Sequence, residues 1–552
     1  MIGVLAQSEK RAVVAEFFEL FKTPWEWAER NREYDVLLST VDAEFSNYGF
    51  SLILLYSGIE VDFDKKAGIS GAAAGPTLKW NEERLPIYGD SRKFRGEADA
   101  TLLDEQSSEA VLVLRNWGTS RVVRIGYDLF AETHHLLTVG QPVEFAGIAT
   151  LELHIALLKS IILAAGIPVA EIPPTPAGFR SITCLTHDID HPSIRGHCCD
   201  HTMFGFLRRA VIGSLVRFLR DRITLRDVLI NWGASLRLPL VYVGLAKDFW
   251  ADFAMRYVET EKGIHSTFFV IPFKDRAGMT GAGSAPRYRA AAYSASDIAA
   301  SLAELIAAGC EVGLHGLDAW HDVGCAAEEF EEIRRVTGVA VAGVRMHWLY
   351  YGAESPAVLE QAGATYDSTI GYRETVGYRA GTTQAFKPLG ATKLLELPMQ
   401  VMDTALFYPA YMGLLMREAR SMLQQFAEDA SRFGGCLIVN WHDRSLAVER
   451  LWSACYRELL DELRARETWF ATCAEAAAWF RKRRSVVFER DVSDGEAVRA
   501  RMTSGDEGLP SLVLRTHMPL KPTDAGTGEA GQVADVLLVG GSLMELRSRQ
   551  TV

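Results

Sequence analysis

Between residues 179 and 484, short apolar runs alternate with longer segments of helical periodicity. The runs are ITCLT, STFFVIP, EVGLHG, VAGVRMH, LLELP, CLIVNWH and TWFAT, and short apolar runs of this kind are typical of buried parallel strands. Between the second and third runs, Ile298, Leu302, Leu305 and Ile306 share one helix face, and Gly309 follows its end. This alternation predicts a parallel α/β sheet that is closed or nearly closed into a barrel.

Two further regions flank this alternation. The proline-rich stretch 171–178 (EIPPTPAG) cannot continue a helix and marks a boundary. Before it, strand-like runs precede the apolar helical stretch 151–166, which predicts an α/β accessory domain. After the basic sequence RKRR, short β-like runs are separated by Gly, Asp and Pro turns. We therefore predict three domains: an accessory domain over 1–172, a barrel over 179–484 and a small β-rich module over 485–552.

Composition and charge narrow the class of protein. Of the 552 residues, 48% are hydrophobic, which favours large packed cores, and the formal net charge of −12 argues against general affinity for nucleic acid. The eight cysteines form no CxxC pair, which indicates free thiols in a reducing compartment. Glu9, Lys10 and Arg11 interrupt the amino end where a signal peptide needs an apolar stretch, and no uncharged run approaches ~20 residues. We expect a cytoplasmic chain without a membrane span.

The candidate chemistry begins where the run ITCLT continues into HDIDHP at 187–192. Asp188 and Asp190 are separated by one residue, so both side chains lie on the same side of an extended strand and can face one site. Two like charges this close repel each other unless a cation holds one of them. A helix cap or a turn before the proline is the simpler alternative.

Histidines at the next strand end suggest further metal ligands. His315 lies in EVGLHG, and His321 follows in the adjoining loop. An aspartate plus two imidazoles from separate loops gives a three-ligand divalent site that leaves positions open for water, as a catalytic metal requires. For His321, an ordinary loop role is an equal alternative.

A candidate proton donor ends the strand CLIVNW. An imidazole such as His442 at the mouth of a buried strand is suited to proton transfer near neutral pH. Because side chains alternate along a strand, Asp443 should point away from His442. Asp403, after the run LLELP, is the better candidate for its partner, with a turn residue as the alternative.

The run VAGVRMHWLYY places Arg345 and His347 on one face of a strand. An arginine there can hold a neighbouring carboxylate in its ionised form. Aromatic residues such as Trp348 and Trp441 offer surfaces for stacking on sugar rings, although core packing is the more common role of such residues. We therefore consider His347, Trp348 and Trp441 as candidate substrate contacts.

Taken together, the ordered motifs THDID, EVGLHG with a later histidine, GVRMH, ATYDSTIGYR with GYRAGT, LELPM and VNWHD resemble the polysaccharide deacetylase superfamily (NodB homology, carbohydrate esterase family 4). The resemblance covers roughly residues 180–484. It implies a distorted (β/α)7 barrel and metal-dependent removal of an acyl group from an amide nitrogen, usually N-acetyl on an amino sugar.

The resemblance also implies roles for individual residues. Asp188 matches the catalytic base, Asp190 and His315 match two metal ligands, His442 matches the acid that protonates the leaving nitrogen, and Arg345 matches the arginine that braces the base. The family's second metal histidine is expected four residues after the first, where this chain has Ala319. We expect His321 to replace it through a longer loop, with His347 as the rival ligand.

The expected function is a metal-dependent hydrolase that removes an acetyl or formyl group from an amino sugar, a glycan or a lipid-linked precursor. Zinc is the expected metal, with cobalt, nickel or manganese as alternatives. The arginine-rich stretch 204–227 allows peripheral contact with an anionic membrane, although a helix face packed on the barrel is the simpler interpretation. Because Ala319 departs from the family pattern, the alternative function is an inactive barrel that binds carbohydrate or acts as a scaffold.

Overall fold

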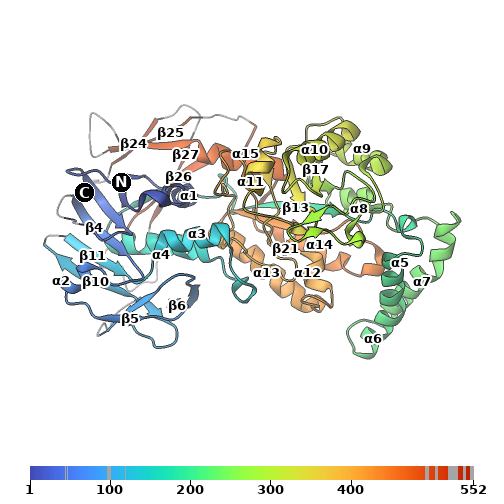
Figure 1. The fold of residues 1–552 in the computed structure, drawn as a ribbon, viewed down its shortest axis with the longest axis horizontal. Coiled ribbons are helices and arrows are strands. Elements are labelled where there is room, and N and C mark those ends of the chain that lie inside the picture. The colour runs from blue at the N-terminus through green and yellow to red at the C-terminus, as the bar shows by residue number, and fades with distance from the viewer. Residues whose placement is uncertain are drawn as a thin grey trace. The chain divides into compact units, whose positions relative to one another are not determined.

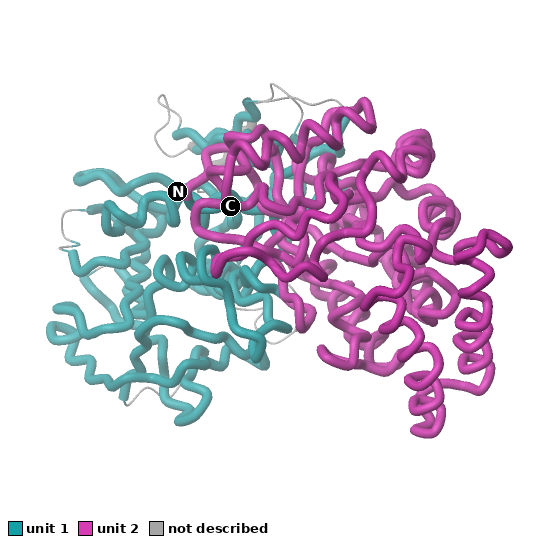
Figure 2. The backbone as a smooth tube through the Cα atoms, turned by 45° about the vertical axis from the view of Figure 1, so that its right-hand side comes forward, with its two compact units in different colours: residues 1–177, 378–389, 478–552 teal, residues 178–377, 390–477 magenta. Residues whose placement is uncertain are grey.

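A computed structural model gives the fold of the chain. It describes residues 1–43, 45, 48–95, 101–118, 120–490, 497–503, 508–519, 532–538 and 543–547. The chain forms two compact units: unit 1 contains residues 1–177, 378–389 and 478–552, and unit 2 contains residues 178–377 and 390–477 (Figure 2). The division into three domains predicted from the sequence stays a prediction.

Unit 2 is built on a nine-stranded parallel sheet in the order β20-β19-β18-β17-β14-β13-β22-β21, with β23 paired to β13 off this path. The strands are β13 (Ser181–Ile189), β14 (Thr267–Val270), β17 (Glu311–Gly316), β18 (Gly343–Met346), β19 (Tyr366–Asp367), β20 (Leu395–Glu396), β21 (Val401–Met402), β22 (Cys436–Asn440) and β23 (Thr468–Phe470). Each apolar run predicted as a strand contributes one, and β19 and β21 are additional two-residue strands.

Helices lie around this sheet, as Figure 1 shows for β13, β17 and β21. They are α8 (Phe253–Thr260), α9 (Ala299–Ala307), α10 (Val323–Thr337), α11 (Ser355–Gln361), α12 (Asp403–Phe407), α13 (Met416–Phe433) and α14 (Ser453–Arg464), with a short hairpin of β15 (Met279–Thr280) and β16 (Gly283–Ser284). In α9, Leu302 and Leu305 are buried, and Gly309 takes a positive φ of 83° just past the helix end. The predicted α/β barrel, an open parallel barrel in this chain, is confirmed.

A helical insert separates β13 from β14. It consists of α5 (His201–Leu207), a π-helical turn (Arg208–Gly213), α6 (Ser214–Leu219) and the longer α7 (Leu225–Tyr242). Thr224 caps α7, because its side chain and that of Asp227 each bond the other's backbone N–H. Figure 1 shows α5, α6 and α7 at the outer edge of unit 2, beyond α8.

Unit 1 contains a mixed six-stranded sheet in the order β10-β11-β4-β3-β1-β2, in which only the β10–β11 pair is antiparallel. Its strands are β1 (Ile2–Leu5), β2 (Trp25–Trp27), β3 (Glu33–Ser39), β4 (Gly49–Tyr56), β10 (Leu112–Trp117) and β11 (Ser120–Ile125), and its helices are α1 (Arg11–Phe21), α2 (Asp62–Lys66), α3 (Leu129–Thr138) and α4 (Thr150–Ala164). The predicted α/β character of the amino-terminal region is therefore confirmed.

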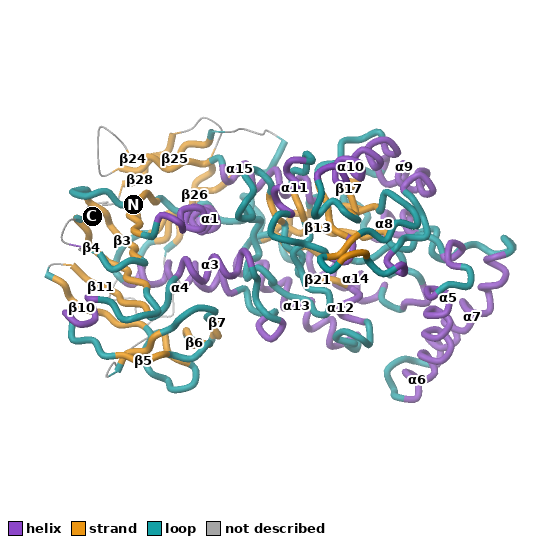
Figure 3. The backbone as a smooth tube through the Cα atoms, viewed as in Figure 1, coloured by secondary structure: helices purple, strands orange, loops and turns teal. Residues whose placement is uncertain are grey.

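Short antiparallel strands complete unit 1 (Figure 3). Two small sheets are formed by β5 (Gly71–Ala73) with β8 (Arg92–Phe94), and by β6 (Thr77–Trp80) with β7 (Glu83–Pro86) and β9 (Leu102–Asp104). After α15 (Cys473–Arg484), the β-rich carboxyl-terminal part supplies β24 (Val486–Arg490), β25 (Ala497–Met502), β26 (Leu512–His517), β27 (Val533–Leu538) and β28 (Leu543–Arg547). Strand β26 pairs with β12 (Val169–Glu171).

None of the described helices combines the length and the apolar character that crossing a bilayer requires. All eight cysteines, each within the described residues, are free thiols, as predicted.

A buried ion pair in unit 1 gives a stability prediction. Arg124 and Asp64 are both fully buried, with the guanidinium Nε 2.9 Å from the carboxylate Oδ1. Asp64→Asn leaves the Arg124 charge buried without its counterion, so we expect the free energy of unfolding to fall by about 3–5 kcal/mol. Urea unfolding followed by circular dichroism measures the loss.

The matched control for this prediction is Asp62→Asn on the same helix. The Asp62 side chain is 69% exposed and lies 3.5 Å from Lys65, so its removal should change stability by less than about 1 kcal/mol. Equal losses in the two variants would contradict the assigned importance of the buried pair.

Candidate active site

The carboxyl ends of the barrel strands meet at one polar cavity. Strands β13, β17, β18 and β22 are parallel neighbours or near neighbours in the sheet, so the residues that follow them gather at the same edge. The cavity has a volume of about 220 Å³. Its lining comprises Asp188, Asp190, His191, His315, His347, Trp348, Leu349, Arg373, Met402, Thr404, Tyr408, Tyr411, His442 and Arg444.

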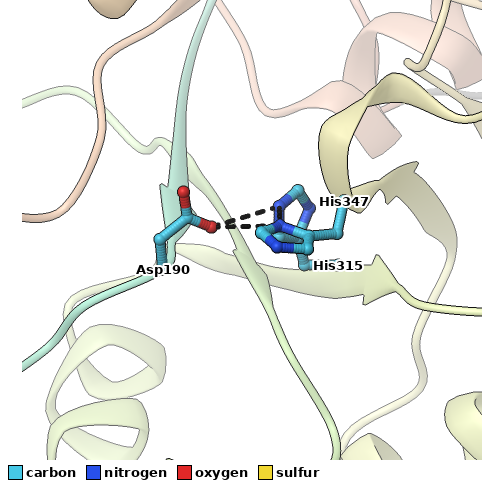
Figure 4. A group of neighbouring side chains, drawn as sticks. All are labelled: Asp190, His315 and His347. Atoms are coloured by element: carbon cyan, nitrogen blue, oxygen red, sulfur yellow. Dashed lines mark hydrogen bonds and ion pairs between the residues drawn. The ribbon is translucent and has the colours of Figure 1, made fainter. Parts of the chain in front are cut away.

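Asp190, His315 and His347 form the group best suited to hold a metal ion. Their ligand atoms all lie within 4.8 Å of one another. The Oδ1 atom of Asp190 is 3.4 Å from Nε2 of His315 and 3.3 Å from Nδ1 of His347, and Figure 4 shows both imidazoles turned toward this oxygen. One aspartate and two histidines with open positions is a donor set that suits a catalytic divalent cation.

The hydrogen bonds of the two histidines support this interpretation. Nδ1 of His315 donates to the carbonyl oxygen of Arg345 at 2.9 Å, and Nε2 of His347 donates to the carbonyl oxygen of Arg289 at 3.1 Å. In a neutral imidazole, the other nitrogen then carries a lone pair, and these two nitrogens lie 3.1 Å apart. They converge on the buried Oδ1 of Asp190, which accepts no hydrogen bond. A cation between the three atoms satisfies all of them, so the residues fit a metal.

The charge of Asp190 is consistent with this role. Burial would raise the pKa of Asp190, but the neighbouring imidazoles of His347 and His315 hold it well below its ordinary value. Burial lowers the pKa of His347, which favours the neutral, ligating form.

Asp188 lies beside this group with both carboxylate oxygens hydrogen-bonded. Arg345 donates to Oδ1 at 3.0 Å, and Asn440 donates to Oδ2 at 2.7 Å. Burial would raise the pKa of Asp188, but Arg345 and the histidines lower it, so the carboxylate is ionised. Because Asp188 also lines the cavity, it is placed to accept a proton there.

Arg345 is itself fully buried and fixed on every side. Its guanidinium donates to Thr186 Oγ1, to Asp188 and to both the carbonyl and the hydroxyl of Ser368, and it lies over the ring of Phe269. A charge held in this way orients the carboxylate of Asp188 as well as ionising it.

His442 and Asp403 form a second hydrogen-bonded pair at the cavity. Nδ1 of His442 donates to Oδ1 of Asp403 at 2.6 Å, and Asp403 Oδ2 accepts the backbone N–H of His442 at 2.8 Å. Burial would lower the pKa of His442, but the carboxylates of Asp403, Asp190 and Asp188 raise it to about 10. The imidazole is therefore held protonated, with Nε2 3.7 Å from Oδ2 of Asp190.

His321 does not join the Asp190 group. Its Nε2 lies 3.4 Å from Oδ1 of Asp318, and its side chain is 32% exposed. Asp318 is anchored by Arg276 and by the backbone N–H of Met279, which keeps this part of the loop away from the three ligands. The geometry thus favours His347, the rival ligand, over His321, while the ligand role itself stays a prediction.

The predicted aromatic contacts lie in different environments. Trp348 is partly exposed and lines the cavity, and the backbone φ of 65° at this residue turns the chain directly after His347. Trp441 is fully buried and packs against Tyr456 and Phe407. Trp441 follows β22 and, unlike His442, is not among the residues that line the cavity, so a substrate contact for it finds no support in this position.

Asp443 and His187 contact residues that surround the site. Asp443 Oδ2 accepts the backbone N–H of His191 at 2.7 Å, so it positions the turn after β13 rather than the His442 imidazole. His187 bonds the carbonyl of Trp441 and lies 3.1 Å from Glu261, on the opposite side of β13 from Asp188.

Asn440 and Arg444, which contact residues of the site, were not among the sequence predictions. Asn440 orients Asp188, and it could have been found as a polar residue two positions before His442, on the same face of an otherwise apolar strand. Arg444 lines the cavity and donates to the hydroxyl of Tyr408 at 3.2 Å. Burial would raise the pKa of Tyr408, but Arg444 and Arg450 lower it to about 8.

Comparisons with known proteins found low similarity to solved structures over part of the chain. No family model matches the chain, and no curated protein matches it. A protein of Mycobacterium smegmatis named as a polysaccharide deacetylase is 19% identical, with 56% of this chain and 94% of that chain covered and a TM-score of 0.35. A second protein so named, from Pseudomonas aeruginosa PAO1, is 13% identical, with 56% and 94% covered and a TM-score of 0.34.

Puue allantoinase is 13% identical, with 56% of this chain and 92% of that chain covered and a TM-score of 0.33. Two of these three structures bear the family name that the motifs resemble. The identities and TM-scores are low, so the assignment of function depends on the residues of the cavity.

Proposed function

We propose that the chain is a metal-dependent amide hydrolase that removes an acetyl or formyl group from the nitrogen of an amino sugar or a glycan precursor. The observation that supports this proposal is the convergence of two imidazole lone pairs and one buried carboxylate oxygen, Oδ1 of Asp190, beside a braced carboxylate and a protonated histidine. Amide hydrolysis needs these parts: a cation, a base and an acid.

Asp190, His315 and His347 are the residues that hold the cation in this proposal. When bound, a divalent ion supplies Lewis-acid activation of water and of the scissile carbonyl oxygen. The expected metal is zinc, with cobalt, nickel or manganese as alternatives. The carbonyl oxygens of Arg345 and Arg289 fix the rings of the two histidines in the orientation that ligation requires.

Asp188 acts as the base. Arg345 and Asn440 hold its carboxylate ionised and oriented toward the cavity, where it takes a proton from the attacking water as the new C–O bond forms. The amide C–N bond then breaks, and the leaving nitrogen needs a proton.

His442 supplies that proton from Nε2. Asp403 binds the Nδ1 hydrogen and stabilises the positive charge of the ring, so Asp403 is a positioning residue. The products are a carboxylic acid and a free amine. Trp348 and the stacked pair Tyr408 and Tyr411 offer ring faces on which a sugar can lie.

The proposal is tested by a substrate screen with the zinc-loaded and the chelator-treated protein. We expect the loaded protein to release acetate or formate from at least one member of a panel of N-acetylated and N-formylated amino-sugar nucleotides, lipid-linked amino sugars and chitooligosaccharides. Chelation should abolish the release, and added zinc should restore it. Enzymatic assay of free acetate and formate gives the readout.

The second candidate function is a carbohydrate-binding or scaffolding protein without activity. Ala319, at the position where the resembled family has a metal histidine, motivates it. A chain that binds one metal ion and binds oligosaccharides by calorimetry, but releases no acid from any member of the panel, would favour this function over hydrolysis.

A further inference from the structure

The helical insert α5–α7 exposes an unusually apolar outer face. In α7, large apolar side chains recur at the spacing of one helix face: Leu225, Leu229, Trp232, Leu236 and Leu240. Their exposed fractions include 60% for Leu229 and 80% for Leu236. Nearly half of the exposed large apolar side chains of the described residues lie in this insert and the three residues that follow it, namely Phe204, Val211, Ile212, Leu215, Val216, Leu219, Leu225, Leu229, Trp232, Leu236, Leu240, Val243 and Leu245.

This outer face is distinct from the face that packs on the barrel. Met203, Phe206, Leu238 and Val241 are buried in a cluster with Trp250. The insert therefore already has a core-facing side, and α7 is apolar on both sides. Folding of the barrel does not explain the outward leucines, because exposing such side chains to water is unfavourable.

The insert is also strongly basic in an acidic chain. Residues 201–245 contain seven arginines (208, 209, 217, 220, 222, 226 and 237) and two aspartates (221 and 227), whereas the whole chain has a net charge of −12. Arg208, Arg220, Arg222, Arg226 and Arg237 are exposed. Positive charge is thus concentrated on the same element as the exposed apolar side chains.

We propose that the α5–α7 insert binds the surface of an anionic lipid bilayer. Amphipathic helices rich in arginine, with tryptophan, phenylalanine and leucine among their apolar residues, lie in the headgroup region of such membranes. The lipid phosphates neutralise the arginines, and the acyl boundary receives the leucines. A second copy of the chain is a poorer occupant, since a symmetric contact would bring the same arginines together.

The insert begins at the candidate active site. His201, the first residue of α5, lines a cavity together with Asp190, Tyr288 and Trp348. Binding of the insert to a bilayer therefore holds the unit that contains this cavity at the membrane. This inference concerns binding alone and is tested without substrate, so it stands or falls independently of the proposed hydrolysis.

The test is flotation of the full-length protein with vesicles. We expect the wild type to float with vesicles containing phosphatidylglycerol and phosphatidylcholine, and to stay at the bottom with pure phosphatidylcholine. Leu229→Gln/Leu236→Gln should lower the partition coefficient by about a hundredfold, because each leucine contributes the burial of one apolar side chain. Arg220→Gln/Arg222→Gln/Arg226→Gln should lower it by a similar factor of about a hundred.

Ile59→Gln/Val143→Gln provides the matched control, since these side chains are 62% and 47% exposed in unit 1. This control should float like the wild type, and circular dichroism should give the same helix content for all variants. The proposal is overturned if the wild type does not bind anionic vesicles, or if both insert variants bind as it does. It is equally overturned if sedimentation shows that the insert mutations dissociate a dimer while vesicle binding is absent.

Discussion

Replacing His347 by alanine is expected to remove the bound divalent metal from the purified protein. His347 contributes one of the three converging ligand atoms, and its Nδ1 lies 3.3 Å from Oδ1 of Asp190. Loss of a residue that merely supports a ligand already costs about 10- to 100-fold in metal affinity, so loss of a ligand should exceed a hundredfold. Zinc titration against a competing chelator, with metal content after dialysis as a second readout, measures this effect.

The matched variant is His321→Ala, which removes the histidine expected from the sequence to replace the family's second metal histidine. Because His321 faces Asp318 at 3.4 Å, its loss should leave zinc affinity within about twofold of the wild type. The reverse outcome, with zinc lost from His321→Ala and retained by His347→Ala, would establish the ligand set Asp190, His315 and His321.

The second large effect is expected for Asp188→Asn. The amide preserves the size of the side chain but cannot accept a proton, so kcat should fall by about 10²- to 10⁴-fold on whichever substrate the screen identifies. Asp188 is not part of the ligand group, and the zinc content should stay at that of the wild type. Steady-state kinetics with metal analysis of the same sample separates the two effects.

Asp461→Asn is the control for this change, since the Asp461 side chain is 77% exposed on α14, in the same unit. It should retain full activity. An Asp188→Asn protein that contains metal and turns over substrate at the wild-type rate would refute the assignment of the base.

Much of the barrel could be predicted because each buried strand is recognisable from a short stretch of the sequence. Buried parallel strands need uninterrupted apolar runs, and every predicted run of unit 2 contains a strand. Alternation along a strand predicted that Asp188 and Asp190 share one side of their strand. It likewise predicted that Arg345 and His347 share one side of theirs. In the structure, all four lie at the same cavity or brace a residue that does.

The third ligand position depended on the path of a loop, which periodicity does not determine. Asp322 caps α10 by accepting the backbone N–H of Cys325, and Glu329 accepts the backbone N–H groups of Leu317 and Asp318. These bonds fix the turn in which His321 lies. They depend on Asp322 and Glu329, which follow His321 in the chain, and not on the spacing between the histidines, so the sequence pattern alone could not choose between His321 and His347.

The sequence also did not show how deeply each side chain is buried in the fold. Trp348 and Trp441 both lie just after a strand, yet Trp348 lines the cavity and Trp441 is fully buried. The two-residue strands β19 and β21 were missed for a related reason, because two residues are too few to show any alternation.

Unit 1 is assembled from three separate segments of the chain, and this arrangement has a consequence for biosynthesis. The buried carboxylate of Glu152 accepts hydrogen bonds from Thr383 and Gln384, and β12 pairs with β26, all within unit 1. When residues 1–177 have emerged from the ribosome, Thr383, Gln384 and β26 have therefore not yet been synthesised. Unit 2 has all of its residues once position 477 has emerged, whereas unit 1 also needs residues 478–552. A fragment ending at residue 177 would leave Glu152 buried without these donors, so the amino-terminal region is not expected to mature alone.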